Sequence, residues 1–143
     1  MFAMEIALNE PDIPKAHYAS MRLDDIYPYL PFEGTLTIVY DDQIVFSEDI
    51  AAVEFYWYLA NWYKAESIER RSPFRYTTIE YYEPILSFSY SRENQWNVES
   101  PWINSSPLLV PEDLLESQVQ KLVSGLAAAF EPYSDNAYSA SGV

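Results

Sequence analysis

Pairs of carboxylate residues are the feature of this sequence most able to do chemistry. Two carboxylates held close together can act as general acid and general base, or as acid and nucleophile, in hydrolysis. The candidate pairs are Asp24/Asp25, Asp41/Asp42 and Glu80/Glu83. Neighbours on a strand point to opposite faces, and Asp is common in turns for backbone reasons. Glu80 and Glu83 lie at a predicted proline bend, but an acid-rich sequence produces such pairs by chance, so none is marked as catalytic.

Other kinds of catalytic site lack their characteristic residues. His17 is the single histidine and cysteine is absent, so a Ser-His nucleophile system or a His/Cys metal cluster has no support. The three glycines, Gly34, Gly125 and Gly142, form neither a phosphate-binding loop nor a dinucleotide-binding motif. We therefore expect no catalytic residue, no metal ion and no cofactor.

Net charge is the most informative bulk property. Lys and Arg number 8 against 22 Asp and Glu, which gives a formal charge of −14. The imbalance is concentrated in residues 1–63 and 93–143, whereas residues 64–92 are nearly neutral. Such a negative field repels nucleic-acid phosphates and anionic membranes, so we expect neither as a direct partner. It attracts basic proteins and speeds encounter with them, although acidity also serves simply to keep a protein soluble.

The sequence also bears on cellular location. The absence of cysteine fits a reducing compartment. The N-terminal residues carry no basic segment followed by a signal-peptide core, and no apolar run reaches the ~18 residues of a membrane span. We expect a cytoplasmic protein that does not insert into a membrane.

A helix is predicted over residues 48–66, with Ser47 or Asp49 as its N-terminal cap. At about 100° per residue, its apolar residues fall on one broad face. These are Ala52, Val53, Phe55, Tyr56, Leu59, Ala60, Trp62 and Tyr63. Trp57 and Tyr58 fall on or near the polar side, together with Glu54 and Asn61, so the core does not obviously claim them.

The rest of the chain predicts an antiparallel sheet and a second helix. Strands are expected at 2–8, 35–40, 43–47, 74–82, 85–91 and 95–100, with Asp41-Asp42 as a hairpin turn. A proline-containing loop follows, and then an amphipathic helix over 111–130 with Pro111 as its first residue. We expect an α+β fold in which two main helices pack one twisted sheet of five to six strands. Residues 1–130 form a single predicted domain and 131–143 a flexible tail.

Aromatic and acidic residues suggest a protein-binding surface. Trp and Tyr anchor many protein interfaces, and an acidic rim around them suits a basic partner. The predicted binding residues are Trp57, Tyr58, Glu54, Asn61, Asp41, Asp42, Glu48 and Asp49. The alternative for Trp57 and Tyr58 is packing against another element of the fold.

Several short strings resemble an uncharacterised family of small bacterial proteins that are similar to immunity proteins of toxin–antitoxin pairs. The strings are Phe32-Glu-Gly34, the helix that ends near Trp62, Tyr82-Glu-Pro-Ile-Leu-Ser-Phe88 and Trp96-Asn-Val-Glu-Ser-Pro-Trp102, within residues 32–130. The resemblance contains no catalytic motif. It implies an α+β fold and a protein-binding role.

Three hypotheses about function follow. The favoured one is a non-catalytic module that occludes a basic partner, such as a nuclease toxin. The second is a mimic of DNA, or an anti-defence protein, with carboxylates spaced like phosphates. The third is an enzyme or small-ligand receptor with an aromatic pocket between the first helix and the sheet, in which Glu80 or Glu83 would be buried.

Overall fold

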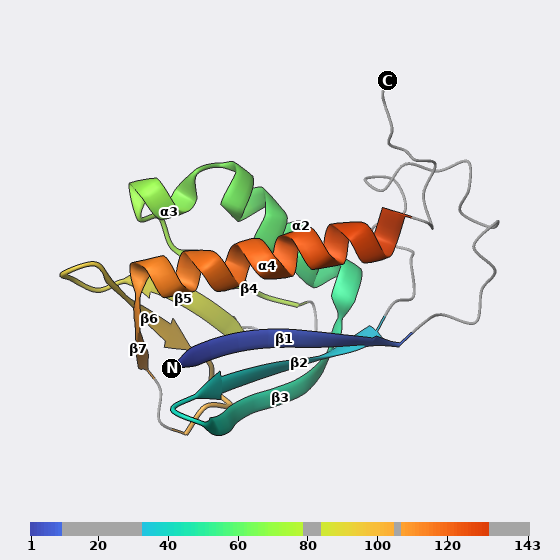
Figure 1. Cartoon of the computed structure of the whole chain (residues 1–143), viewed down its shortest axis with the longest axis horizontal. Helices are drawn as coiled ribbons and strands as arrows, with labels where there is room; N and C mark the ends of the chain where they lie inside the picture. The colour runs from blue at the N-terminus through green and yellow to red at the C-terminus, as the bar shows by residue number, and fades with distance from the viewer. Residues whose placement is uncertain (10–32, 79–83, 105–106, 132–143) are drawn as a thin grey trace.

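Two antiparallel sheets and two main helices enclose one aromatic-rich core (Figure 1). The computed structural model describes residues 1–9, 33–78, 84–104 and 107–131, to which every structural statement here refers. Predictions about His17, Asp24, Asp25, Glu80, Glu83 and the tail from residue 132 lie outside these ranges. The predicted α+β class with two main helices is confirmed. The predicted single sheet is wrong, because the described strands form one sheet of three and one of four.

The first sheet has the strand order β1-β2-β3. Its strands are β1 (Phe2–Asn9), β2 (Glu33–Tyr40) and β3 (Gln43–Ala51). Along β2, Leu36 and Ile38 are buried whereas Thr35 and Thr37 are only half-buried. This alternation is typical of a sheet that packs one face on the core. The predicted first strand and the predicted hairpin are therefore both present.

Gly34 allows the inner face of this sheet to pack closely. A Cβ atom at Gly34 would lie 3.1 Å from the backbone oxygen of Ala7 and 3.1 Å from Leu8 Cδ2. It would also lie 3.2 Å from Ile6 Cγ1. The side chains of β1 thus fill the space that a side chain at position 34 would need.

Asp41 and Asp42 form the two-residue turn between β2 and β3, as predicted. Their φ angles are 52° and 67°, so both adopt the left-handed conformation that suits a tight hairpin. Asp tolerates this conformation better than most residues, although glycine adopts it at lower cost. The turn therefore stands without any glycine.

Helix α2 (Ala52–Lys64) begins four residues later than predicted. Residues 47–51 belong to β3 instead, where Asp49 pairs with Thr35 and Ala51 pairs with Glu33. Ladder hydrogen bonds to β2 outweigh the local preference of these acids for a helix start. Ala51 is the N-cap and makes no side-chain capping bond, so the predicted caps Ser47 and Asp49 are wrong. The predicted apolar face is buried, except that Tyr63 is half-buried.

The second sheet has the strand order β4-β5-β6-β7. Its strands are β4 (Phe74–Tyr76), β5 (Leu86–Tyr90), β6 (Gln95–Glu99) and β7 (Leu108–Pro111). The strands predicted at 85–91 and 95–100 are present as β5 and β6, with Leu86, Phe88, Trp96 and Val98 buried and Tyr90 half-buried. Only the first three residues of the strand predicted at 74–82 form β4; residues 79–83 lie outside the described ranges.

Strand β7 lies where the sequence predicted a loop. Leu108 and Val110 are buried and pair with Val98 and Trp96 of β6. Leu109 between them is 46% exposed, so the short strand follows the usual alternation of a half-covered sheet. With Pro111 at its end, the segment resembled a loop in sequence because only four residues carry the pattern.

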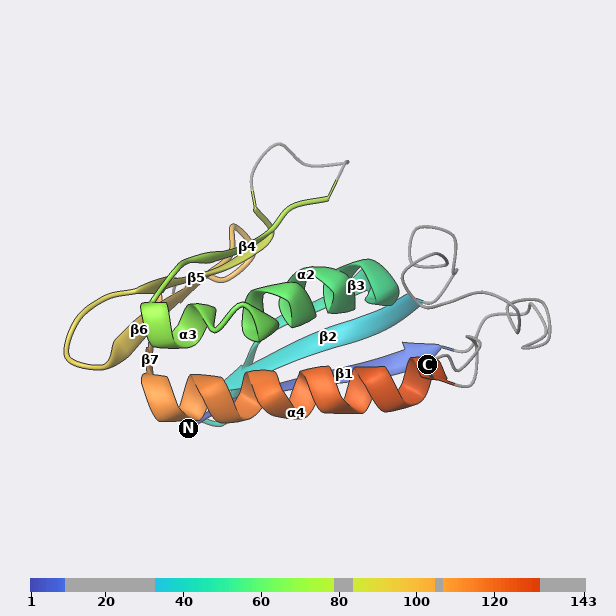
Figure 2. The same ribbon diagram turned by 90° about the horizontal axis from the view of Figure 1, so that it is seen from above.

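Two further helices follow α2 along the chain. The short helix α3 (Ser67–Arg70) comes directly after α2, and the long helix α4 (Glu112–Phe130) comes after β7. Pro111 is the N-cap of α4 rather than its first residue, a shift of one position. Helix α4 buries Leu115, Val119, Leu122, Leu126 and Phe130, the apolar face of the predicted amphipathic helix. Figure 1 shows α2 and α4 above the three-stranded sheet, and Figure 2 shows that they lie side by side.

Trp62 is the centre of the core that joins α2 to the second sheet. Its ring centroid lies 5.5 Å from that of Phe74, 5.8 Å from Phe88 and 5.9 Å from Trp96. Its indole N–H donates a 3.0 Å hydrogen bond to the carbonyl of Ser72. Edge-to-face contacts of this kind contribute on the order of 1 kcal/mol each beyond burial. They fix α2 on the four-stranded sheet.

Candidate protein-binding surfaces

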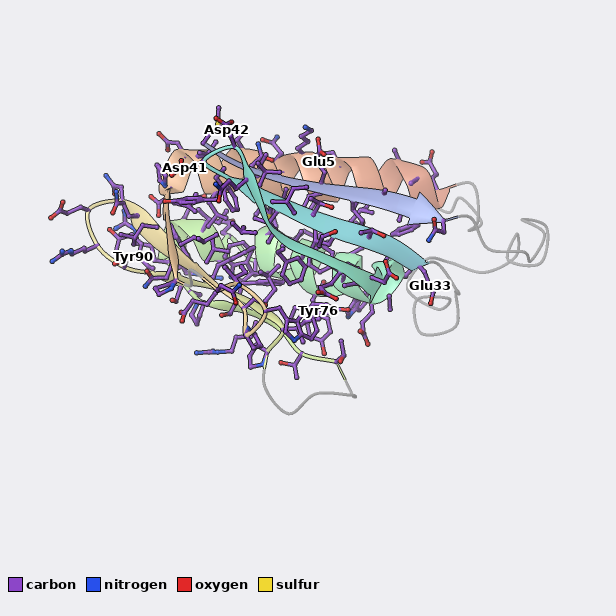
Figure 3. The ribbon with its side chains drawn as sticks, turned by 90° about the horizontal axis from the view of Figure 1, so that it is seen from below. Glu5, Glu33, Asp41, Asp42, Tyr76 and Tyr90 are labelled. Carbon is purple, nitrogen blue, oxygen red and sulfur yellow. The ribbon has the colours of Figure 1, made fainter. Side chains whose placement is uncertain are left out.

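The described residues on the outer face of the three-stranded sheet include several acids and no Lys or Arg. Because Leu36 and Ile38 face the core, alternation places Thr35, Thr37 and their register partners on the opposite face. That face includes Glu5, Glu33 and Asp49, and the turn adds Asp41 and Asp42 at one end (Figure 3). These five exposed acids are called the acidic sheet face below. Residues 1–9 and 33–51 contain no Lys or Arg.

Between its acids, the acidic sheet face is built from small side chains. Ala7 pairs with Thr35, which pairs in turn with Asp49, and Glu5 pairs with Thr37. Thr35 Oγ1 donates a 2.8 Å hydrogen bond to Asp49 Oδ1, which orients that carboxylate. Small residues leave the backbone accessible and make the surface flat, so a partner can approach it closely.

The chain's amino group offsets one of these acids. The nitrogen of Met1 lies 2.9 Å from Asp41 Oδ1, and both groups are more than 70% exposed. An exposed pair of this kind contributes between zero and about 1 kcal/mol to stability. Asp42, Glu5, Glu33 and Asp49 have no cationic partner among the described residues.

Glu48 lies apart from the acidic sheet face. It pairs with Leu36, whose side chain is buried, so the side chain of Glu48 lies on the opposite side of the sheet from the acidic sheet face. Of the five acids predicted as a rim, Asp41, Asp42 and Asp49 therefore belong to one surface, whereas Glu48 and the helix residue Glu54 do not. Sequence reasoning missed Glu5 and Glu33, because only the pairing of β1 with β2 brings them beside Asp49.

The predicted helix residues Glu54 and Tyr58 contact the second sheet. Tyr76 of β4 is fully buried, and its hydroxyl donates a 3.0 Å hydrogen bond to Glu54 Oε1. The ring of Tyr58 stands edge-on to Tyr76 with 5.4 Å between centroids, and Tyr58 is 37% exposed. Both residues thus hold α2 on the four-stranded sheet, which supports the packing alternative for Tyr58. A binding role for them stays a prediction.

Trp57 and Asn61 complete the predicted helix group. Trp57 is half-buried and Asn61 is exposed. Figure 3 shows Asp41 and Asp42 far from Tyr76, and thus from the helix residues around Tyr76. The structure therefore places the turn acids far from Glu54 and Tyr58.

Basic residues gather elsewhere on the molecule. The described Lys and Arg residues are Lys64, Arg70, Arg71, Arg75, Arg92 and Lys121. Four of them lie between the end of α2 and β4, and Arg92 lies in the turn between β5 and β6. Of these six, Lys121 on α4 lines the groove beside the three-stranded sheet.

A groove runs between β1 and α4. It encloses about 420 Å³ and is lined by residues 4–8 of β1, by Thr35 and Thr37 of β2, and by four residues of α4. The four are Lys121, Leu122, Gly125 and Leu126. A Cβ atom at Gly125 would meet nothing within 4 Å, so the missing side chain widens the groove. No aromatic residue lines it, unlike the aromatic pocket predicted beside the first helix.

The described residues offer little for metal or membrane chemistry. Within 1–9, 33–78, 84–104 and 107–131, no three His, Cys, Asp or Glu side chains are grouped as ligands for a metal ion. In the same ranges, none of the helices combines the length and apolar character needed to cross a bilayer.

Comparison with known proteins identifies a family and no activity. The family DUF7878, described as a domain of unknown function, matches residues 4–131. The chain belongs to the DUF7878 family. No curated protein and no solved structure matches it. The match spans both the acidic sheet face and the groove, so both surfaces lie within the DUF7878 domain of this chain.

Proposed function

We propose that this DUF7878 protein is a non-catalytic cytoplasmic module that binds a basic protein, and that it acts as an immunity-type inhibitor. The observation that carries this proposal is the acidic sheet face, on which five exposed acids stand without a basic side chain over 1–9 and 33–51. A partner such as a nuclease toxin presents a basic surface to its substrate. Covering that surface inhibits the partner without any chemistry by the inhibitor.

Attraction between opposite charges raises the association rate of such a complex more than its affinity. Complementary charge raises association rate constants from a typical 10⁵–10⁶ M⁻¹s⁻¹ toward roughly 10⁸ M⁻¹s⁻¹ at low salt. The flat, small-residue surface between Glu5, Thr37 and Asp49 lets a partner's Lys or Arg approach carboxylates directly. The exposed side chains of Ile44 (68%) and Leu109 (46%) offer apolar contacts on β3 and β7.

Mimicry of DNA receives less support from the spacing of the acids. Glu5 and Asp49 stand on the two outer strands of the sheet, and neighbouring strands are roughly 4.8 Å apart, which separates them laterally by about 10 Å. DNA presents one charge for roughly every 1.7 Å of its axis. The acids thus form a dispersed patch, which suits a protein partner better than a phosphate-binding groove.

Basic proteins encoded beside the gene are the partners to test, by calorimetry with each purified pair. A variant with Glu5→Gln, Glu33→Gln and Asp49→Asn removes three charges from the acidic sheet face. The matched control, Glu69→Gln, Glu99→Gln and Glu116→Gln, removes three exposed charges from other surfaces. We expect the first variant to bind at least about tenfold more weakly, or ~1.4 kcal/mol, and the control to bind like the unmodified protein. Equal weakening by both would contradict the proposal.

A further inference from the structure

Among the described residues, strand β1 pairs only with β2, so its other edge is free of strand pairing there. Helix α4 lies along that edge in both Figure 2 and Figure 3. The Asp41 N–H donates a 2.8 Å hydrogen bond to the Met1 carbonyl, and the Met4 N–H points the other way, to Gln118 Oε1 at 3.0 Å. Since outward and inward positions alternate in an antiparallel pair, the backbone groups of Ile6 and Leu8 also point away from β2.

Gln118 hydrogen-bonds to the backbone of this edge at one position, the N–H of Met4. Ile6 and Leu8 line the groove, and among the described residues no side chain hydrogen-bonds to their outward N–H and C=O groups. Unpaired backbone groups along an edge strand are a template for another strand. The Gln118 bond shows that the outward N–H of Met4 is accessible to an acceptor placed beside this edge.

We propose that the groove between β1 and α4 binds an extended segment of the basic partner as an additional strand beside β1. This inference rests on the proposed function, and it names the form in which the partner binds. Main-chain hydrogen bonds to Ile6 and Leu8 supply affinity, and pockets for alternate side chains supply specificity, as in other complexes formed by strand addition.

The walls of the groove determine which side chains the segment carries. Side chains on one face of an added strand meet Leu122, Leu126 and the open space at Gly125, so they are apolar. Lys121 stands on the same wall and disfavours a basic residue there. Side chains on the other face lie beside Glu5, where an opposite charge across strands is worth roughly 0.2–1 kcal/mol. The segment therefore alternates apolar and basic residues.

A second copy of the chain fits this edge poorly. In every copy, α4 flanks the edge of β1 and Gln118 bonds to Met4. Two such edges would bring two α4 helices together before their strands could pair. A single extended segment, which carries no flanking helix, enters the groove without that collision.

The test uses a capped peptide of about six residues that alternates valine and lysine, titrated into isotopically labelled full-length protein. We expect saturable amide shifts at Ile6, Leu8 and the α4 residues of the groove. A peptide of the same composition in scrambled order binds at least about tenfold more weakly, or ~1.4 kcal/mol. Two further peptides are N-methylated at the valines or at the lysines, and the one whose methyl groups face β1 loses binding to the same degree. Equal binding of both N-methylated peptides would overturn the proposal, as would the absence of shifts at about millimolar peptide.

Two variants of α4 locate the site. Gly125→Phe places a ring in the groove and abolishes binding of the peptide, whereas Ser124→Phe, at the neighbouring exposed position outside the groove, leaves binding unchanged. Equal effects of the two variants would overturn the groove as the site. If Gly125→Phe retains the full basic partner while the acidic-sheet-face variant loses it, the proposed function stands and the strand addition fails. If the peptide binds in the groove but no basic protein binds, the groove accepts an added strand and the proposed function fails.

Discussion

The indole nitrogen of Trp96 donates a 2.9 Å hydrogen bond to Glu112 Oε2, and Arg71 Nε lies 3.2 Å from the same oxygen. One carboxylate thereby joins β6, the end of α3 and the first residue of α4. Arg71 also donates to Asn94 Oδ1 at 2.7 Å and stands 4.3 Å from the ring centroid of Tyr90. This cluster fastens α4, one wall of the groove, to the four-stranded sheet.

Replacement of Glu112 by alanine is predicted to destabilise the protein by about 1–3 kcal/mol. The reason is that the N–H of Trp96, a fully buried residue, loses its acceptor. Urea unfolding followed by tryptophan fluorescence measures the change. Glu116→Ala, at an exposed position of the same helix, is the control and is expected to cost less than about 0.5 kcal/mol. Equal losses from the two variants would show that the Trp96 bond contributes nothing.

The same carboxylate predicts a pH dependence. Its hydrogen bond from Arg71, and secondarily that from Trp96, lowers the pKa of Glu112, while partial desolvation opposes them. A carboxyl whose pKa is lower in the folded state stabilises the fold above its ordinary pKa of about 4.3, and this contribution is lost as pH falls through the folded value. The difference in unfolding free energy between the unmodified protein and Glu112→Gln should be constant from neutral pH to about 4.3 and shrink below it. A difference that grows on acidification would contradict this sign.

The β2–β3 turn predicts a stabilising substitution. Asp42 has a φ of 67°, which glycine adopts without steric cost. Asp42→Gly is therefore expected to raise the unfolding free energy by about 0.5–1 kcal/mol. Asp42→Asn, which removes the charge but keeps a side chain, controls for electrostatics and should change stability less. Thermal unfolding of the unmodified protein and the two variants measures these differences. A lower midpoint temperature for the glycine variant would count against the assigned turn geometry.

Gly34 and Gly125 predict opposite responses to alanine. Gly34→Ala brings a methyl group 3.1 Å from the backbone oxygen of Ala7, and over-packing of this kind typically costs 1–3 kcal/mol. Gly125→Ala meets nothing within 4 Å, and it gains helix propensity of about 1 kcal/mol. The denaturant concentration at the unfolding midpoint should fall for Gly34→Ala and rise for Gly125→Ala. Similar shifts in the same direction would mean that β1 does not approach β2 as described.

Local periodicity predicted those elements whose pattern is long and one-sided. The apolar face of α2, from Ala52 to Trp62, and the alternation through β5 and β6 follow directly from residue spacing. The start of α2 was misplaced because Ser47–Ala51 contains acids and small residues that also suit a helix start. Pairing with β2, which is not visible in local sequence, decides that segment in favour of a strand.

The candidate surfaces were harder to predict because they depend on register. Glu5 and Glu33 join Asp49 only through the pairing of β1 with β2 and of β2 with β3. The groove likewise exists only because α4 lies beside β1. These elements are far apart in sequence: Met4 and Gln118, which hydrogen-bond to each other, are separated by 114 positions. The available sequence signals were Gly125 within an amphipathic helix and an N-terminal strand with a single acid, neither of which indicates a groove alone.

The dependence of the association rate on salt tests the central claim most directly. Stopped-flow measurement of complex formation with the basic partner, over ionic strengths at which the Debye length falls from roughly 30 to 8 Å, reports charge steering. We expect a steep fall in rate for the unmodified protein and for the control in which Glu69, Glu99 and Glu116 are replaced by Gln. A clearly shallower fall is expected when Glu5, Glu33 and Asp49 are neutralised. Equal salt dependence in all three proteins would contradict recognition through the acidic sheet face.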